Sequence, residues 1–304
     1  MRRNLLHRKS KGIQVAVEKP QRALWLRKAW YDFSRNRASV VGLAMVLIVI
    51  VCAVAAPIIA THPDHAGLFL DFKSKFNPPS LEHFFGTDNV GRDVFSRVIF
   101  AFRFSLLLGC GVLAIAVPVG TILGLIAGYY KGSIIDTVIM RTTDVFLSLP
   151  PLVLALTIAS ILTPNLRNAL LAVSITWWPW YCRMIYSIVS SVRNEPYVRM
   201  AEILGAPRRH ILGGEILPNC ITPLFTKMTL DMGGVILLGA SLSFVGLGVQ
   251  PPTPGLGTML SKGTLYLPNA WWLVIFPALG IFLVVAGFNL LGDGLRDILG
   301  SRDV

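Results

Sequence analysis

Six apolar runs alternate with polar, charged segments along the chain. Most of the runs approach the roughly 20 apolar residues that a helix needs to cross a bilayer. None shows the strict alternation of a membrane β-strand, and in lipid the backbone hydrogen bonds of a crossing segment must close internally. The pattern therefore predicts an all-α polytopic membrane protein with six transmembrane helices. The runs cover residues 38–60, 104–130, 145–162, 169–182 (continued past Arg183), 232–249 and 271–291.

Composition agrees with this pattern. Hydrophobic residues make up 54% and charged residues 14% of the chain, where soluble domains average about 25% charged. The first run is long and follows an extended basic segment, so we expect an uncleaved anchor rather than a signal peptide. The predicted division is a basic N-terminal arm at 1–37, a first transmembrane helix at 38–60, an extracytoplasmic loop at 61–103, a core with five further helices at 104–292, and a C-terminal tail at 293–304.

The Lys and Arg residues are distributed unevenly between the two sides. Alternate inter-helix segments that start with the N-terminal arm hold 20 of the 28, the opposite segments hold seven, and Lys227 lies in the fifth span. Positive residues favour the cytoplasmic side, so both termini are predicted to be cytoplasmic. The net charge of +12 then reflects topology and contact with lipid rather than nucleic-acid binding.

Motifs for catalysis are missing from the sequence. The dipeptide Gly-Lys of a phosphate-binding loop never occurs, and neither GxSxG nor HExxH is present. Three classes of protein remain: a channel or carrier that works alone, a membrane-embedded enzyme, and a membrane subunit driven by a separate ATPase. The four cysteines show no metal or disulfide spacing. His62 and His65 leave a weak metal contact open, but the sequence predicts neither a metal site nor a cofactor.

Residues 199–219, RMAEILGAPRRHILGGEILPN, form a polar segment between the fourth and fifth runs. Pro196 suits the first turn of one short helix, Gly205 suits a left-handed stop, and Pro207 suits the start of a second short helix. The predicted elbow is either an ordinary basic loop that lies on lipid headgroups or a rigid docking surface for a cytoplasmic partner. Its expected apolar face is Ile203, Leu204, Ile211 and Leu212, and its expected charged face is Arg199, Arg208 and Arg209.

This segment resembles the EAA loop of bacterial ABC importer permeases. Gly205 takes the glycine position of that loop, Ala201 its second alanine, and Leu217 and Pro218 its Leu-Pro pair. The sequence departs from the family pattern at three positions. Arg199 stands where the family has glutamate, Met200 where it has the first alanine, and Glu215 where it has isoleucine; Glu202, one turn on, is the candidate replacement for the missing acid.

Three longer stretches resemble the dipeptide/oligopeptide subfamily of these permeases, and most closely its C-type subunit. They are GTDNVGRDVFSRVIFAFRFSLLLG at 86–109, LSFVGLGVQPPTPGLGTML at 242–260 and FNLLGDGLRD at 288–297. The resemblance implies a type I importer permease fold in the bacterial inner membrane, with coupling helices between spans four and five. It also implies a homologous B-type permease, two ABC ATPase subunits and an extracytoplasmic substrate-binding protein as partners.

The cargo implied by the resemblance is a dipeptide or oligopeptide, and nickel, glutathione or oligosaccharides remain alternatives. An ATP-independent carrier is the alternative from another class, and an embedded hydrolase fits less well because no nucleophile–base constellation is present.

Two further groups of residues are candidate sites. The turn residues between the first and second runs either close the extracytoplasmic loop or contact a partner protein; they are Gly86, Asp88, Gly91, Arg92 and Asp93. On the fifth span, which extends ahead of its apolar run, Lys227 and Asp231 form either a structural ion pair or a polar lining of the translocation route. Small residues further along, among them Ser241 and Ser243, either pack the helices or line the pathway or a permease–permease face.

Overall fold

The computed structural model describes residue 31 and residues 33–300. All regular secondary structure in that part of the chain is helical, apart from an isolated bridge between Thr87 and Asp93. The helices and short turns follow in chain order. They are α2 (Arg37–Val54), α3 (Ala56–Ile59), η1 (Pro63–Ala66), η2 (Phe72–Ser74), α4 (Val94–Tyr129), α5 (Ile134–Leu147), α6 (Pro151–Ile161), α7 (Leu166–Val192), α8 (Pro196–Ile203), α9 (Arg208–His210), the π-helix η3 (Ile211–Ile216), α10 (Leu217–Phe244), α11 (Leu256–Thr264) and α12 (Trp272–Gly300).

Among residues 33–300, four helical stretches are long and apolar enough to cross a membrane: α2, α4, the continuous helix Arg208–Phe244 and α12. The pair α5 and α6 makes a fifth if the two are counted as one broken span. Helix α7 is long, with 27 residues, but tryptophan, tyrosine, proline and arginine dilute its apolar content. The all-α membrane class is confirmed, and the count of six spans stays a prediction.

The third predicted span, at 145–162, is not one straight helix. Helices α5 and α6 meet at 92° across a short break. The cause is the Pro150–Pro151 pair: Pro150 is extended, with ψ of 128°, because a residue that precedes proline avoids the α conformation. The apolar run is therefore divided between the end of α5 and the whole of α6.

Two other helices begin earlier than their apolar runs suggest. Helix α4 begins at Val94, ten residues before the run at 104–130, because the side chain of Asp93 caps it by accepting a hydrogen bond from the Ser96 amide. The helix that contains the fifth run begins at Arg208 and ends at Phe244, so residues 245–249 form a turn at its far end.

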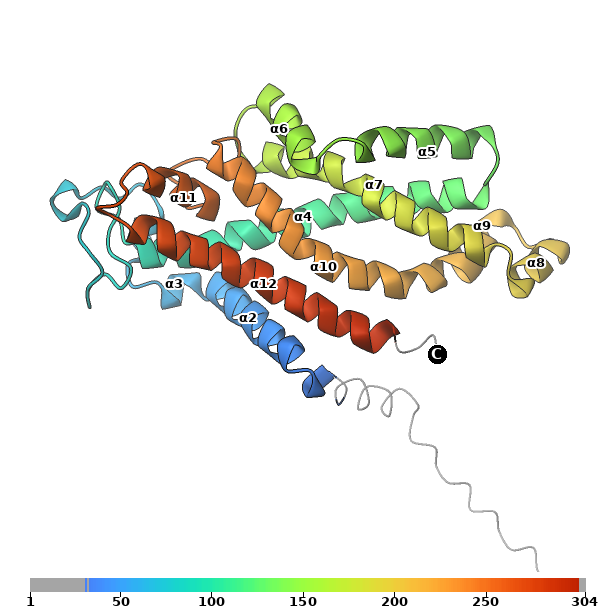
Figure 1. The fold of residues 1–304 in the computed structure, drawn as a ribbon, viewed down its shortest axis with the longest axis horizontal. Coiled ribbons are helices and arrows are strands. Elements are labelled where there is room, and N and C mark those ends of the chain that lie inside the picture. Colours follow the sequence, from blue (N-terminus) through green and yellow to red (C-terminus); the bar gives the residue numbers. More distant parts are fainter. Residues whose placement is uncertain (1–30, 32, 301–304) are drawn as a thin grey trace, which may run out of the picture.

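Helices α4 and α7 form the most extensive helix–helix contact. Gly120, Gly124 and Gly128 lie along it at intervals of four residues, and a Cβ at Gly124 would lie 2.6 Å from the Cys182 carbonyl oxygen of α7. Small residues at this spacing let two membrane helices approach closely. Helix α12 packs between α2 and α10, so α4, α7, α10, α12 and α2 form one continuous bundle (Figure 1).

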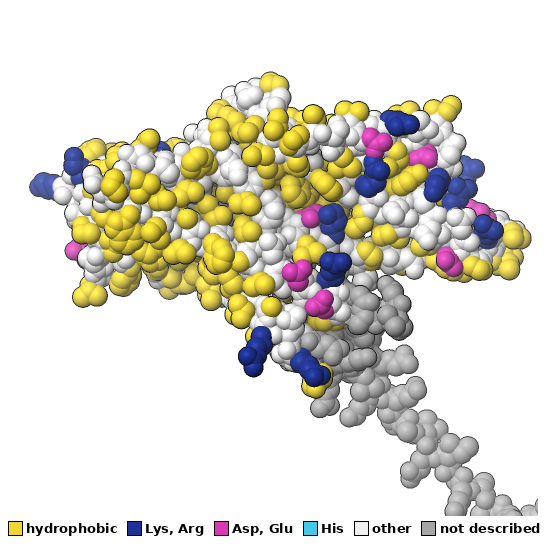
Figure 2. All heavy atoms as spheres, in the orientation of Figure 1, with side chains coloured by type: hydrophobic (Ala, Val, Ile, Leu, Met, Phe, Trp, Pro, Cys, Tyr) yellow, Lys and Arg dark blue, Asp and Glu magenta, His cyan; other side chains and the backbone are white. Residues whose placement is uncertain are grey.

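The bundle has two distinct ends along its long axis (Figure 1). The segment before α4 and helix α11 gather at one end, which we call the loop end; α8 and α9 project at the other, the elbow end. Figure 2 shows apolar side chains over most of the middle of one face, whereas charged side chains gather at the elbow end and around the start of α2.

Candidate functional site

The elbow begins with α8, which ends in a well-defined glycine turn. Gly205 has φ of +77°, a conformation that favours glycine. The Ala206 amide donates to the Ala201 carbonyl and the Gly205 amide to the Glu202 carbonyl, both at 3.0 Å, which is the Schellman arrangement. The predicted left-handed stop at Gly205 is therefore present.

The second half of the elbow differs from the prediction of two separate short helices. Helix α9 is only one turn, and it runs through the π-helix η3 directly into α10. Gly213 and Gly214 favour the end of a helix by propensity. Instead they lie inside the π-helix, where Ile211 and Ile216 on either side are buried and hold the backbone in helical register. The elbow is thus one short helix joined by a turn to the beginning of a long helix.

A separate hydrophobic core holds the elbow against the bundle. Val198 of α8 and Ile211 and Ile216 of η3 are each at most 1% exposed, and they pack with buried residues at the ends of α4 and α7: Tyr129, Ile185 and Val189. Burial of each such aliphatic side chain stabilises the fold by about 1.5–3 kcal/mol. Two helices of the bundle and α8 therefore behave as one packed unit.

Polar contacts add to this attachment. The Tyr129 hydroxyl donates to Glu202 at 3.1 Å, and Arg208 donates to the Tyr130 hydroxyl at 3.3 Å. Arg208 also lies over the Tyr130 ring, 5.7 Å from its centroid. Glu202, the candidate replacement for the family's glutamate, is thus tied to the end of α4.

The outward surface of the elbow combines exposed apolar side chains with charge. Ile203 and Leu204 are each 79% exposed, although they lie on a short helix in a polar segment. Among the described residues, the exposed Arg199 side chain bonds only to Asn194, and the Arg209 side chain forms no hydrogen bond or ion pair. We call Arg199, Ile203, Leu204 and Arg209 the elbow surface.

The other predicted elbow residues are divided between surface and interior. The predicted apolar face was wrong in part, because Ile211 is buried and Leu212 half-buried on the inner side, where the α9–η3 helix turns them toward the core. Ala201 is half-buried against the same core, as is Leu217, and Pro218 is exposed at the start of α10.

Lys227 and Asp231 form an ion pair one turn apart on α10. Lys227 Nζ lies 3.1 Å from Asp231, and the Trp177 indole N–H of α7 also donates to Asp231 at 3.1 Å. The Lys227 ammonium lies over the rings of Trp180 and Tyr181, at 5.8 and 5.5 Å from their centroids. The pair therefore links α10 to α7 through groups that satisfy both charges.

Ser241 and Ser243 occupy different environments at the far end of α10. Ser241 lines an open, mostly apolar hollow of about 380 Å³ between α6, α10, α11 and α12. Ser243 is 5% exposed and accepts a hydrogen bond from the Val249 amide at 3.3 Å, so it holds the turn that follows the helix. The structure does not bring these two serines together with Lys227 and Asp231.

At the loop end, the predicted turn residues form a tightly bonded loop before α4. Gly86 and Gly91 have φ of +71° and +83°, and a Cβ at Gly91 would collide with the Asp71 carbonyl oxygen. Asp88 accepts from the Arg92 amide at 2.9 Å and from Arg92 Nε at 2.8 Å. These contacts support the structural reading of the turn, with Asp93 as helix cap.

Positive charge is in excess around Asp88. Besides Arg92, Arg97 Nε lies 3.8 Å from the Asp88 carboxylate. Asp88, Arg92 and Arg97 line one small cavity together with Lys262 of α11. Desolvation in this cavity, together with the charges of Arg92 and Arg97, lowers the pKa of Lys262 below its ordinary value. Arg97 also donates to the carbonyl oxygens of His65 and Pro252, so it joins the loop end to the segment between α10 and α11.

Sequence reasoning missed two features of this arrangement. The glycines at 120, 124 and 128 carry a G-x₃-G-x₃-G spacing that predicts a close helix contact, and that signal was present in the sequence. His83 was not singled out, and no local motif marks it, because its neighbours His62 and Asp93 are reached only through the fold.

Comparison with known proteins gives two family matches. Residues 120–302 match the model of the binding-protein-dependent transport system inner membrane component. Residues 24–79 match the N-terminal TM domain of oligopeptide transport permease C.

Individual relatives cover almost the whole chain. A dipeptide transport system permease protein, DppC of Haemophilus influenzae, is 39% identical over 281 residues, covering 91% of this chain and 95% of the relative. The DppC protein of Escherichia coli is 43% identical over 283 residues, covering 91% and 93%. A probable D,D-dipeptide transport system permease protein, DdpC of E. coli, is 40% identical over 264 residues, covering 87% of each.

Proposed function

The chain belongs to the family of binding-protein-dependent transport system inner membrane components, a family of transport permease subunits rather than enzymes, and from that membership we propose that it imports peptides. Its relatives are named for dipeptides, so dipeptides or short oligopeptides are the proposed cargo. The same machinery could carry nickel, glutathione or oligosaccharides, and these remain the alternative cargoes.

The proposed energy source is ATP hydrolysis by two partner ATPase subunits. The sequence contains no phosphate-binding loop of the GxxxxGK[ST] type, so nucleotide must be bound by another chain. An extracytoplasmic binding protein would deliver the peptide, and a homologous permease subunit would complete the pathway. The apolar hollow beside Ser241 suits a surface that a second permease covers, with the Lys227–Asp231 pair as a tentative polar element of the route.

The elbow surface is the observation that carries the proposal. Ile203 and Leu204 expose apolar area on a polar end of the molecule, yet the backbone below them is fixed by the Gly205 turn and by the buried Val198. A loop that only connects two helices has no need for exposed apolar side chains on a rigidly packed backbone. A partner protein that covers Ile203 and Leu204 would bury their apolar area. A movement of that partner would then pass to α4 and α7 through the hydrophobic core under the elbow. An ATP-independent carrier would leave this surface without a role.

The proposed orientation places the elbow end and both termini in the cytoplasm. The start of α2 and the end of α12 lie toward the elbow end in Figure 1. Cysteine labelling tests this in a background in which the four native cysteines are replaced by serine. Lys75→Cys should react with an impermeant reagent from outside, and Arg209→Cys only after permeabilisation; labelling of both from one side would contradict the proposal.

A binding experiment tests the coupling surface directly. Ile203→Ser and Leu204→Ser should reduce co-purification of the partner ATPases and ATP-dependent uptake, while the amount of inserted protein stays normal. Ile134→Ser is the matched control, because Ile134 is 83% exposed and begins α5 outside the elbow. Normal ATPase association by the Ile203 and Leu204 variants would refute the docking role, and uptake with inactive ATPases would favour the carrier.

A further inference from the structure

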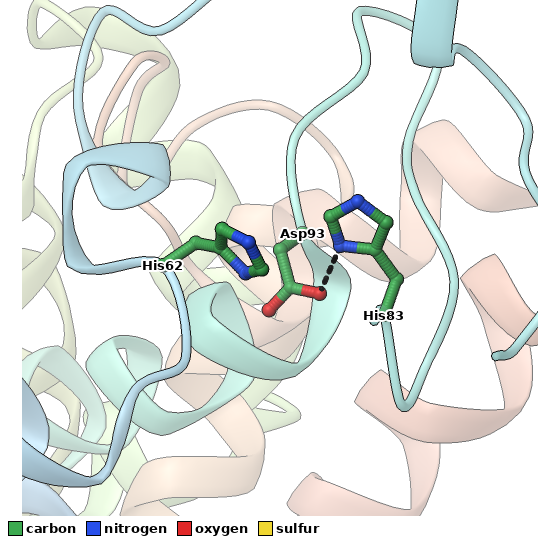
Figure 3. A group of neighbouring side chains, drawn as sticks. All are labelled: His62, His83 and Asp93. Carbon is green, nitrogen blue, oxygen red and sulfur yellow. Dashed lines mark hydrogen bonds and ion pairs between the residues drawn. The ribbon is translucent and has the colours of Figure 1, made fainter. Parts of the chain in front are cut away.

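Three of the chain's five histidines gather around one carboxylate at the loop end. His62 immediately precedes η1, His65 lies within it, His83 belongs to the loop before α4, and Asp93 caps α4. The rings of His62 and His83 have centroids 4.8 Å apart. Figure 3 shows Asp93 between these two rings, with the His83 ring bonded to it. Segments separated by up to 31 positions thus converge on a single point.

The donor atoms of three of these residues are close enough to share an ion. His83 Nδ1 lies 3.0 Å from Asp93 Oδ1. One ligand atom from each of His62, His83 and Asp93 lies within 4.8 Å of the other two. In a tetrahedral zinc site, metal–ligand distances of about 2.0–2.2 Å place neighbouring ligand atoms roughly 3.3–3.5 Å apart. The His83–Asp93 pair is already near that spacing, and the His62 nitrogen, within 4.8 Å of both, would have to move closer when an ion binds.

The two oxygens of Asp93 have separate tasks. Oδ2 accepts from the Ser96 amide at 2.7 Å and from the Thr61 hydroxyl at 3.1 Å, which fixes the carboxylate as the helix cap. Within the described part of the chain, Oδ1 has only His83 as a hydrogen-bond partner. Capping needs one carboxylate oxygen and no histidine, so the cap does not account for the imidazoles on the other side. Ligands whose remaining atoms are held by hydrogen bonds are typical of metal sites.

We propose that His62, His83 and Asp93 form a site for a divalent transition metal, with Zn²⁺ as the best match to two imidazole nitrogens and one carboxylate oxygen. The ion would take the place of the hydrogen between His83 Nδ1 and Asp93 Oδ1, and His83 would bind it as a neutral imidazole that carries its hydrogen on Nε2. Asp93 and His83 are 0% and 7% exposed, whereas His62 is partly exposed, so the fourth position opens toward His62 and takes water.

His65 supports the site without belonging to it. Its Nδ1 accepts the Asp93 amide hydrogen at 2.9 Å, and its ring stacks on Phe69 with centroids 3.8 Å apart. This contact sets the backbone from which the Asp93 side chain projects. A bound ion would join the segment before η1, the loop that holds His83 and the start of α4, so it would brace the loop end of the bundle.

The test uses the full chain, purified in detergent through a tag without histidine, with the four free cysteines changed to serine to remove competing thiolates. Competition with a chromogenic chelator should show one Zn²⁺ per chain, and Co²⁺ should give a visible spectrum of nitrogen and oxygen ligation. Zn²⁺ should also raise the Tm of the chain that keeps all its histidines. His62→Ala should weaken zinc affinity at least tenfold and abolish this rise in Tm. His210→Ala, an exposed histidine at the elbow end, should leave both unchanged.

Asp93→Asn separates metal binding from folding. Asparagine caps a helix about as well as aspartate, so this variant should fold and insert normally yet lose at least tenfold in zinc affinity. Unchanged affinity in either His62→Ala or Asp93→Asn would overturn the site. So would a wild-type chain that binds zinc no more tightly than the His62→Ala variant.

Discussion

The Gly205 turn offers the sharpest test of the elbow as a coupling element. Gly205 has φ of +77°, and nothing lies within 4 Å of the position where a Cβ would be. Substitution there meets no neighbouring atom, so its whole effect comes from backbone strain. Gly213 is the matched control, because it is also open on all sides but has no positive φ.

The magnitude follows from the competing terms. A side chain with a Cβ in the left-handed conformation costs about 1–2 kcal/mol, and a β-branched side chain such as valine lies at the upper end or beyond. Burial of Val198 in the elbow core stabilises α8 by about 1.5–3 kcal/mol. Since the two are comparable, the turn in Gly205→Val would spend a substantial fraction of time relaxed, with α8 displaced. A strain of 1–2 kcal/mol shifts such an equilibrium roughly 5- to 30-fold.

The assay is peptide uptake by proteoliposomes that contain the complete transporter, compared with the amount of inserted protein. We expect Gly205→Val to insert at near-normal levels, because the bundle does not depend on the turn. Uptake and ATPase association should fall about threefold when a strain of about 2 kcal/mol opposes a burial of about 1.5 kcal/mol. Gly205→Asn should lose less, since asparagine tolerates this conformation, and Gly213→Ala should be neutral. Full ATP-coupled uptake by Gly205→Val would show that the elbow does not transmit the motion.

Three further outcomes follow from other parts of the structure. Gly124→Val should lower Tm and yield, because its Cβ would lie 2.6 Å from the Cys182 carbonyl oxygen of α7 and overpacking costs about 1–3 kcal/mol; normal stability would refute the close α4–α7 contact. Lys227→Met and Asp231→Leu should each reduce Tm, with the double variant partly restored, because a lone charge loses its partner; loss of uptake at full stability would instead assign the pair to the pathway. Arg209→Glu should weaken ATPase association at low salt and less at high salt, since exposed charges are screened, whereas Arg209→Lys should not; equal loss at all salt concentrations would exclude a simple charge contact.

Much of the helical architecture could be read from the sequence, because lipid demands long apolar segments with internally closed backbone bonds. The glycine turn at 205 could also be read, since Pro196 and Pro207 bracket it. The start of α4 could not, because residues 94–103 carry Arg97 and Arg103 and are held helical by the cap and by contacts to the loop end. Those contacts come from residues distant in the sequence.

The elbow shows the same division. Exposed Ile203 and buried Ile211 have similar chemistry and similar neighbours, so composition gave no reason to place them on opposite sides. Whether Ile211 is buried depends on whether the helix that begins at Arg208 stops after His210 or continues. The glycine pair at 213 and 214 favours a stop by propensity. Tertiary burial of Ile211 and Ile216 overrides that preference, as packing commonly does for helix propensity.

The unbroken helix Arg208–Phe244 makes the elbow one arm of a lever. Its 37 residues, at about 1.5 Å each, extend for roughly 55 Å, more than the thickness of a bilayer's hydrocarbon core. A rigid tilt of about 5° around the middle would carry its two tips by about 2–3 Å in opposite directions. A push on the elbow-end tip would therefore move the Ser243–Val249 turn in the opposite direction. The space beside the helix would then widen at one end of the bundle and narrow at the other in a single movement. No separate signal between the two ends would be needed.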